Sequence, residues 1–224
     1  ETILVVGGLW IVLPALKQRR RLKMSASILG GFLAIGVAVL PLLGSKRVND
    51  DDIRQAIAAL AQSLQERQLR SDPDAGAFNW AMHGPGGAQV WTTAQALTAL
   101  LALPPDQPPR SLNVPAALGY IDSKRIEGGW GYQARDAQAI TEIDAWVLIA
   151  RALAVRSSGE ISGLSPDQRQ VQLDNLRRDV DTLLKRQFTD GGWGPFEADT
   201  SPGHERTYST LMGLWALVEA RPLL

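Results

Sequence analysis

A short glycine and tryptophan phrase is repeated along this chain, each time between two segments with helical hydrophobic spacing. Two copies are clear: Gly128, Gly129, Trp130 and Gly131, then Asp190, Gly191, Gly192, Trp193 and Gly194. A degenerate third copy, Asp74-Ala75-Gly76-Ala77-Phe78, keeps an acid, a glycine and an aromatic residue in the same order. Glycine lets a chain leave a helix through backbone angles that side chains disfavour, and the aromatic ring can cover apolar surface while an indole N–H finds a partner. The phrase therefore predicts repeated helical hairpins.

The segments that follow the three copies superpose without gaps. They begin at Thr93, Asp144 and Thr210, and each has a leucine four residues later. The leucines are 51 and 66 residues apart. A period this long and uneven is typical of one whole hairpin per unit, with loops of variable length.

Hydrophobic spacing and end signals predict six helices in three hairpins. We expect outer helices that start after Asn49, at 114–124 and at 166–185, with Ser165 as a cap and Pro166 in the first turn. Inner helices are expected from about residue 93, at 143–155 and at 208–220. The inner segments are rich in alanine and leucine and nearly free of charge, whereas the outer ones are charged on one face. This contrast predicts an all-α fold with two layers.

Residues 1–44 differ in composition from the rest and are expected to form a transmembrane helix hairpin. The only charges there are Glu1 and five bases within 17–23, which separate apolar spans at about 3–16 and 25–44. The second span is long enough to cross a hydrocarbon core of about 30 Å. A cleaved signal peptide is the alternative, but an apolar run precedes the basic cluster. A cytoplasmic basic loop would place residues 45–224 outside an inner membrane, in the periplasm.

The second span has small residues every four positions, at Ala26, Gly30, Ala34 and Ala38. Small side chains on one face let membrane helices approach closely. We interpret this stripe as a seam for the first span or for a partner, the alternative being that alanine and glycine are simply common in membrane helices. Residues 45–224 hold 18 basic and 22 acidic residues, a balance that argues against nucleic acid as a partner.

The phrase at 187–194 and the inner helices resemble the repeats of squalene and oxidosqualene cyclases, whose helical toroid protein prenyltransferase β subunits share. The resemblance covers about residues 50–221. It implies that residues 45–224 form three of the six hairpins of an (α/α)6 toroid. Either this half ring stands alone as a curved sheet of helices, or a second copy or another protein completes it.

The same resemblance points to Glu142 and Asp144 as candidate catalytic acids. Cyclases protonate their substrate with an Asp-x-Asp-Asp cluster, and the nearest match here, residues 142–145, lacks the final acid. The alternative is that both acids stabilise the start of a helix capped by Thr141. The zinc site of prenyltransferases has no counterpart, because the chain has no cysteine and reads Tyr208-Ser209-Thr210 where that family has histidine. His83 and His204 are too few to predict a metal site, so no metal or cofactor is expected.

These observations favour a membrane-anchored, non-catalytic binding or assembly module within a larger membrane complex. The expected partners are other membrane subunits, a second copy of the chain, or an apolar lipid. The alternative is an enzyme acting on an isoprenoid or another apolar substrate from the membrane. A carbohydrate-active enzyme, with two carboxylates from Asp136, Glu142, Asp199 and Glu205, is a weaker alternative.

Overall fold

The computed structural model describes residues 49–71, 73–78, 88–103, 111–132, 138–199 and 207–224. The chain divides into two units, Glu1–Asp50 and Asp51–Leu224, and almost all described residues belong to the second. The expected membrane hairpin, with spans at 3–16 and 25–44, lies outside the described residues, as does the small-residue seam. Among the helices that are described, none combines the length and the apolar character needed to cross a bilayer.

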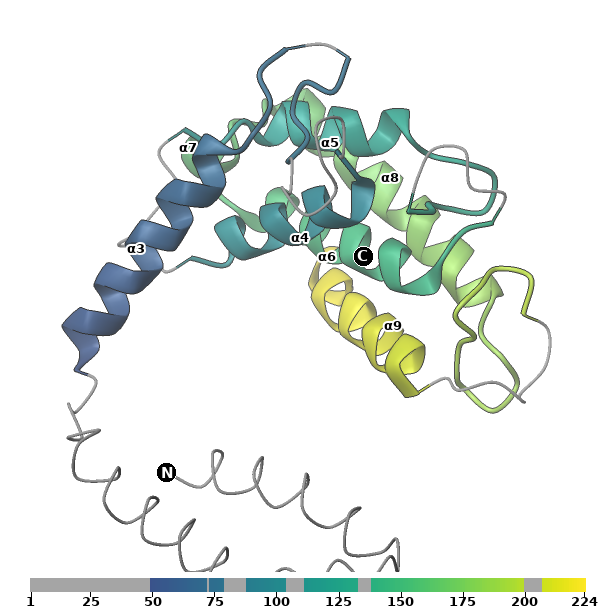
Figure 1. The fold of residues 1–224 in the computed structure, drawn as a ribbon. Coiled ribbons are helices and arrows are strands. Elements are labelled where there is room, and N and C mark those ends of the chain that lie inside the picture. Colours follow the sequence, from purple (N-terminus) through teal and green to yellow (C-terminus); the bar gives the residue numbers. More distant parts are fainter. Residues whose placement is uncertain (1–48, 72, 79–87, 104–110, 133–137, 200–206) are drawn as a thin grey trace, which may run out of the picture. The chain divides into compact units, whose positions relative to one another are not determined.

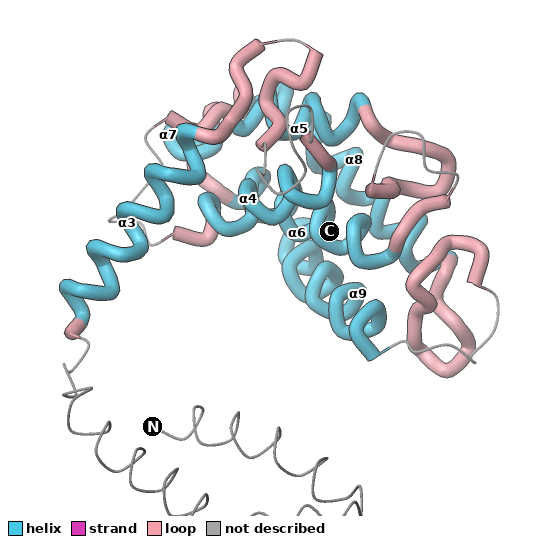
Figure 2. Tube along the Cα trace, in the orientation of Figure 1, coloured by secondary structure: helices cyan, strands magenta, loops and turns pink. Residues whose placement is uncertain are grey.

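The described part of the chain is all-α, as predicted, with isolated bridges but no strands (Figures 1 and 2). Its elements are α3 (Asp50–Glu66), α4 (Val90–Leu101), α5 (Val114–Ser123), α6 (Thr141–Arg156), α7 (Gly159–Ser162), α8 (Pro166–Lys185), α9 (Thr207–Ala220) and the short 3-10 helix η2 (Arg221–Leu223). The six helices expected from the sequence are all present. The four-residue α7 lies in a segment expected to be a polar linker.

Helix α6 is the centre of the fold. It packs against α4 on one side and α9 on the other, and the outer helices α5 and α8 also pack on it. Of its 16 residues, 13 are buried, which fits a helix that is apolar on nearly all sides. Helix α3 is different, because only Ala61 and Gln65 are buried along its 17 residues. The inner helices α4, α6 and α9 pack side by side, and the outer helices α5 and α8 pack against them, which fits the expected two layers. Helix α3 contributes little to the core.

The first residues of α8 and α6 show which of the expected capping residues form a cap. Ser165 and Gln168 form a capping box at α8, with Pro166 in its first turn, as predicted. The expectation that Thr141 caps α6 is wrong. Thr141 is already the first helical residue, and its hydroxyl donates to the carbonyl of Gly194 at 2.7 Å.

Candidate functional site

The aromatic residue of each phrase is buried against its own hairpin. Trp130 and Trp193 are almost completely buried, and their indole N–H groups donate to the carbonyls of Ile121 and Leu183, each at 2.8 Å. Phe78 is buried in the same way in the first unit but has no N–H to donate. This confirms that the two tryptophans fasten their phrases to the outer helices that precede them, α5 and α8.

The glycine two positions before each aromatic residue has the same backbone conformation in all three units. The φ angles are 90° at Gly76, 82° at Gly128 and 87° at Gly191. One further hydrogen bond recurs, in which the carbonyl just before the aromatic residue accepts from a backbone N–H upstream. The pairs are Leu69 N to Ala77 O (2.8 Å), Ile126 N to Gly129 O (3.0 Å) and Phe188 N to Gly192 O (2.8 Å). The degenerate first copy thus keeps the glycine conformation and the accepting carbonyl of the two clear ones, although its hydrogen bond closes a longer loop.

The first residue of each superposed inner segment also has one role. Its side chain accepts a hydrogen bond from the backbone N–H of the aromatic residue. The pairs are Phe78 N to Thr93 Oγ1 (3.1 Å), Trp130 N to Asp144 Oδ1 (2.8 Å) and Trp193 N to Thr210 Oγ1 (3.1 Å). Asp144 therefore stands where threonine stands in the other two units, as the acceptor that joins phrase to inner helix.

The acceptor role can be tested at Thr210, where no charge complicates the result. Replacing Thr210 by valine should lower the free energy of unfolding by about 1–2 kcal/mol, because the Trp193 amide loses its partner. Thr210→Ser keeps the hydroxyl and should cost less. Chemical denaturation of the full chain in a mild detergent measures both. A loss in Thr210→Ser with no loss in Thr210→Val would show that the methyl contacts matter and the hydrogen bond does not.

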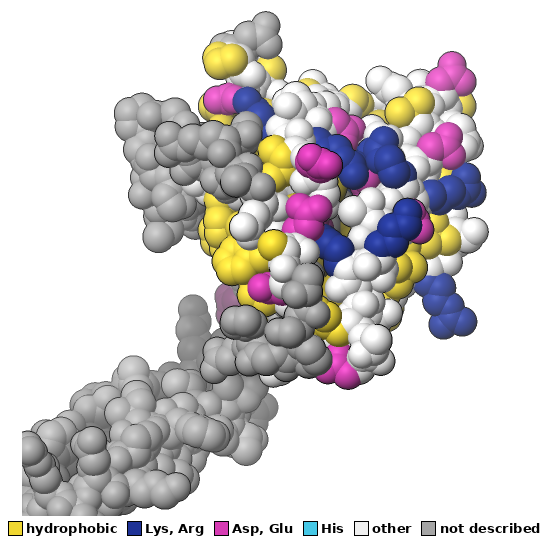
Figure 3. Space-filling model, turned by 90° about the vertical axis from the view of Figure 1, so that its right-hand side faces the viewer, with side chains coloured by type: hydrophobic (Ala, Val, Ile, Leu, Met, Phe, Trp, Pro, Cys, Tyr) yellow, Lys and Arg dark blue, Asp and Glu magenta, His cyan; other side chains and the backbone are white. Residues whose placement is uncertain are grey.

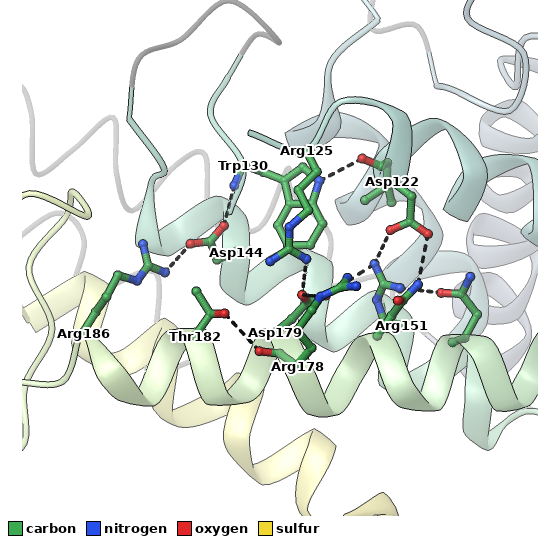
Figure 4. A network of polar contacts seen from close by, with 12 residues as sticks. Asp122, Arg125, Trp130, Asp144, Arg151, Arg178, Asp179, Thr182 and Arg186 are labelled. Carbon is green, nitrogen blue, oxygen red and sulfur yellow. Dashed lines mark hydrogen bonds and ion pairs between the residues drawn. The ribbon is translucent and has the colours of Figure 1, made fainter. Parts of the chain in front are cut away.

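Asp144 is held on both of its carboxylate oxygens. Oδ1 accepts from Trp130, and Oδ2 pairs with Arg186, the residue that follows α8 (Figure 4). The cavity beside it has a volume of about 10 Å³, roughly enough for one water molecule. Burial raises the pKa of Asp144 to about 6, and the pairing with Arg186 opposes that rise.

The raised pKa predicts a pH dependence of stability. In the unfolded chain an aspartate titrates near pH 4. Between about pH 4 and pH 6 the folded state therefore holds a proton that the unfolded state has lost, and the free energy of unfolding falls as the pH rises, by on the order of 2 kcal/mol. Asp144→Asn, which keeps an acceptor for Trp130, should lack this fall. Denaturation of both proteins from pH 4 to pH 7 gives the difference, and parallel profiles would contradict the assignment.

Glu142 lies two residues before Asp144 and makes a different contact. It is half-buried and accepts from the hydroxyl of Tyr208 on α9 at 3.0 Å. Residues two apart on a helix do not face each other, and these two carboxylates share no partner among the described contacts.

The other candidate ligands and acids are only partly described. Asp199 accepts from the backbone N–H of Phe196 at 2.9 Å within its own turn. Asp136, Glu205, His83 and His204 lie outside the described residues. Within the described ranges, no group of three or more histidine, cysteine or acidic residues could hold a metal ion.

A buried charge network, which sequence reasoning missed, joins α5, α6 and α8 (Figure 4). Its centre is Arg151, whose side chain is fully buried and which bonds to Asp122 and Gln172, each at 2.6 Å. Asp179 lies 3.6 Å from Arg151 and also pairs with Arg125. The sequence does contain an indication of this network: Arg151 is the one charged residue within 145–155, a segment that is otherwise apolar.

The tryptophan of the second phrase is part of this network. The guanidinium groups of Arg125 and Arg151 lie 4.9 and 5.9 Å from the centre of the Trp130 ring, within the range of cation–π contacts. The same charged groups thus contact the second phrase and the helices α5, α6 and α8. This indicates that the network stabilises the fold.

The second and third units are joined directly. The backbone N–H of Thr141 donates to the Pro195 carbonyl at 2.9 Å, and the N–H of Glu197 donates to the Ala139 carbonyl at 3.0 Å. With the Thr141 hydroxyl bond to Gly194, three hydrogen bonds connect the start of α6 to the phrase of the next hairpin.

Aromatic residues gather on the inner helices. Trp146 and Trp215 meet edge to face with ring centres 5.3 Å apart, and Trp91 meets Tyr132 at 6.0 Å. The amide of Gln95, oriented to accept, joins Trp91 and Trp146 at 2.9 and 3.3 Å. Beside Trp215 is an open groove of about 400 Å³ between the C-terminal halves of α4, α6 and α9. Arg156 and Glu219, paired at 2.9 Å, lie on its rim.

Exposed surface differs between the outer and inner helices. The face in Figure 3 mixes basic and acidic side chains without a large field of one sign. Helix α9 instead exposes large apolar side chains: Tyr208, Leu211, Leu214, Trp215 and Val218. An apolar surface of this kind usually marks an interaction site.

Comparison with known proteins adds no assignment. No family model matches the chain, and neither a curated protein nor a solved structure matches it. Function is therefore inferred from the geometry of this chain itself.

Proposed function

We propose that this chain is a membrane-anchored, non-catalytic binding or assembly module, a subunit of a larger membrane complex. The observation that carries the proposal is the uncovered apolar surface of α9, the last inner helix. Burial of apolar area is the main favourable term in protein association. The surface follows a row of inner helices, α4, α6 and α9, in which each packs on the next.

The position of Asp144 supports a module without acid catalysis. A catalytic acid must reach the reacting atom. Asp144 instead bonds to Trp130 and Arg186 in a space for about one water, at the position that threonine occupies in the other units. The contacts of Asp144 with Trp130 and Arg186 explain this acid as part of the fold, without a catalytic role.

The row of hairpins also supports the architecture that the sequence suggests. Consecutive inner helices flanked by α5 and α8 are what half of a helical toroid requires, and residues 1–44 would anchor it to the inner membrane. The basic loop at 17–23 would leave the helical domain in the periplasm. Partners would then be other membrane subunits, a second copy, or an apolar lipid.

Native mass spectrometry of the full chain, released from its own membrane in a mild detergent or lipid disc, tests the proposal. Additional protein mass at fixed stoichiometry supports an assembly subunit. A monomer free of protein and lipid contradicts it. Sidedness has its own test: Ser158→Cys, exposed and the only thiol in the chain, should react with an impermeant reagent on intact spheroplasts. Labelling only after lysis would reverse the topology.

A second candidate is an enzyme that acts on an apolar membrane-derived substrate. The observation that favours it is the 400 Å³ groove beside Trp215, whose lining includes Leu101, Ile149 and Leu153. A small apolar molecule retained in the mass spectrum, with no protein partner, would put this candidate first. Product formation from linear polyprenyl substrates would then have to depend on Glu142, the acid that is not buried.

A further inference from the structure

The groove beside Trp215 has the size and the lining of a small-molecule site. Its volume of about 400 Å³ lies within the usual range for ligand pockets. It runs between the C-terminal halves of three helices, α4, α6 and α9, so rigid elements form its walls. The apolar part of its lining consists of Leu101, Ala102, Ile149, Leu153 and Trp215. Such a lining favours a hydrocarbon chain.

One polar side chain of the lining has no partner. The hydroxyl of Thr98 makes no hydrogen bond within the described residues, and the residue is only 6% exposed. A buried hydroxyl without a partner costs free energy. Threonine in a helix has two accessible χ1 rotamers, and rotation between them exchanges its covered hydroxyl with its methyl group. The Thr98 oxygen can therefore gain a partner from a molecule that lies in the groove.

The charges on the rim of the groove balance each other. Arg156 and Glu219 pair at 2.9 Å, and the hydroxyl of Ser157 donates to the Leu153 carbonyl at 2.8 Å. An anionic head group would have to displace Glu219 from Arg156, and a cationic one would have to displace Arg156 from Glu219. The rim thus offers no net charge to complement, which favours a ligand without charge.

We propose that this groove binds an uncharged amphiphile, with a hydrocarbon chain against the apolar lining and a hydroxyl or carbonyl oxygen that accepts from Thr98. A long-chain alcohol and a diacylglycerol both have this chemistry. Burial of the chain supplies the favourable free energy, and the oxygen satisfies the Thr98 hydroxyl. This inference rests on the proposed function, because it names the site and the chemical class of the lipid partner.

Photolabelling of the full chain in a lipid disc tests the site. The probe is a long-chain alcohol with a diazirine on its chain, and peptide mass spectrometry locates the label. We expect saturable labelling at Leu101, Leu153 or Trp215 that excess decanol suppresses. Suppression by a diacylglycerol in the disc would also support the proposal and would identify a membrane lipid as the source. Labelling without saturation, spread over the exposed Leu211 and Leu214, would overturn it.

Thr98→Val tests the hydrogen bond. Valine keeps the shape of the side chain but has no oxygen, so the advantage of decanol over decane as a competitor should fall about fivefold. The melting temperature should not fall, because this hydroxyl has no partner in the described fold. Thr98→Ser keeps the oxygen and should keep the advantage. An unchanged advantage in Thr98→Val would overturn the assigned role, and so would stronger competition by decanoate than by decanol.

Ala102→Trp and Ala99→Trp form a matched pair that tests the position of the ligand. Both alanines are exposed on or directly after α4, but only Ala102 lines the groove. The larger side chain at position 102 should block the groove and remove saturable labelling, whereas the one at position 99 should leave it unchanged. Equal labelling of the two variants would place the probe elsewhere and overturn the proposal.

Native mass spectrometry of the same discs separates failure of this inference from failure of the proposed function. Additional protein mass at fixed stoichiometry, without saturable labelling, overturns the inference and leaves the assembly role standing. A monomer with saturable labelling supports the inference and puts the enzyme candidate first. A monomer with neither protein, lipid nor saturable labelling overturns both.

Discussion

Replacement of Arg151 by methionine is expected to lower the free energy of unfolding by about 3–5 kcal/mol. The guanidinium is fully buried and lies between Asp122, Asp179 and Gln172. Methionine fills much of the space but offers no donor, so the nearly buried carboxylate of Asp179 loses one of its cationic neighbours. Loss of one partner in a buried network costs more than loss of an exposed pair, because the remaining charge stays out of water. Denaturation of the full chain measures the difference.

Arg177 provides the matched control for Arg151. It is also an arginine paired with an aspartate, Asp174 on the same helix at 3.1 Å, but both side chains are about half exposed or more. Arg177→Met should change stability by less than about 1 kcal/mol. Similar small effects of both arginine substitutions would show that the network is solvated.

Replacement of Gly76 by alanine is the second large effect, again about 3–5 kcal/mol of lost stability. Gly76 has a φ of 90°, and a Cβ there would lie 2.2 Å from the backbone carbon and oxygen of Ala116. The clash is with the first turn of α5, a backbone that cannot rotate away as a side chain can. The first hairpin turn would have to move or open, and chemical denaturation should show the loss.

Gly119 is the matched control for Gly76. It lies inside α5, is exposed, and has no atom within 4 Å of the position of a Cβ. Because alanine is the better helix former, Gly119→Ala should raise stability by up to about 1 kcal/mol. A stabilising effect of both substitutions would mean that the turn at Gly76 is not tightly fixed in solution.

Local signals in the sequence were sufficient for the six longer helices and for the glycine conformation in the turns, but not for the short helix α7. Pro166 after Ser165 placed the start of α8, and the glycine and aromatic order identified the degenerate turn at Gly76. These features depend on residues close in sequence. The same reasoning failed for Thr141, which was expected to cap its own helix. Its hydroxyl bonds instead to Gly194, 53 residues away, and no local pattern announces such a partner.

The candidate site was predictable only in part, for the same reason. The sequence singles out Glu142 and Asp144 together because residues 142–145 are the nearest match to the Asp-x-Asp-Asp cluster of the cyclases. Their partners, Tyr208 and Arg186, come from distant elements and separate their roles. The gapless alignment of Thr93, Asp144 and Thr210 held the better clue, since one position that alternates between threonine and aspartate suggests a hydrogen-bond acceptor. Burial of Arg151 depended on how α5, α6 and α8 meet, which spacing alone does not give.

The three hydrogen bonds between the start of α6 and the phrase near Gly194 have a consequence for folding cooperativity. In arrays of repeats, each unit can often unfold almost independently of its neighbours. Here the turn that closes the third hairpin also supplies the acceptors for the first residue of α6, so opening of that turn leaves both the N–H and the hydroxyl of Thr141 without their acceptors. The start of α6 and this turn should therefore open as a single unit, and hydrogen exchange at the amides of Thr141 and Glu197 should give the same free energy of opening.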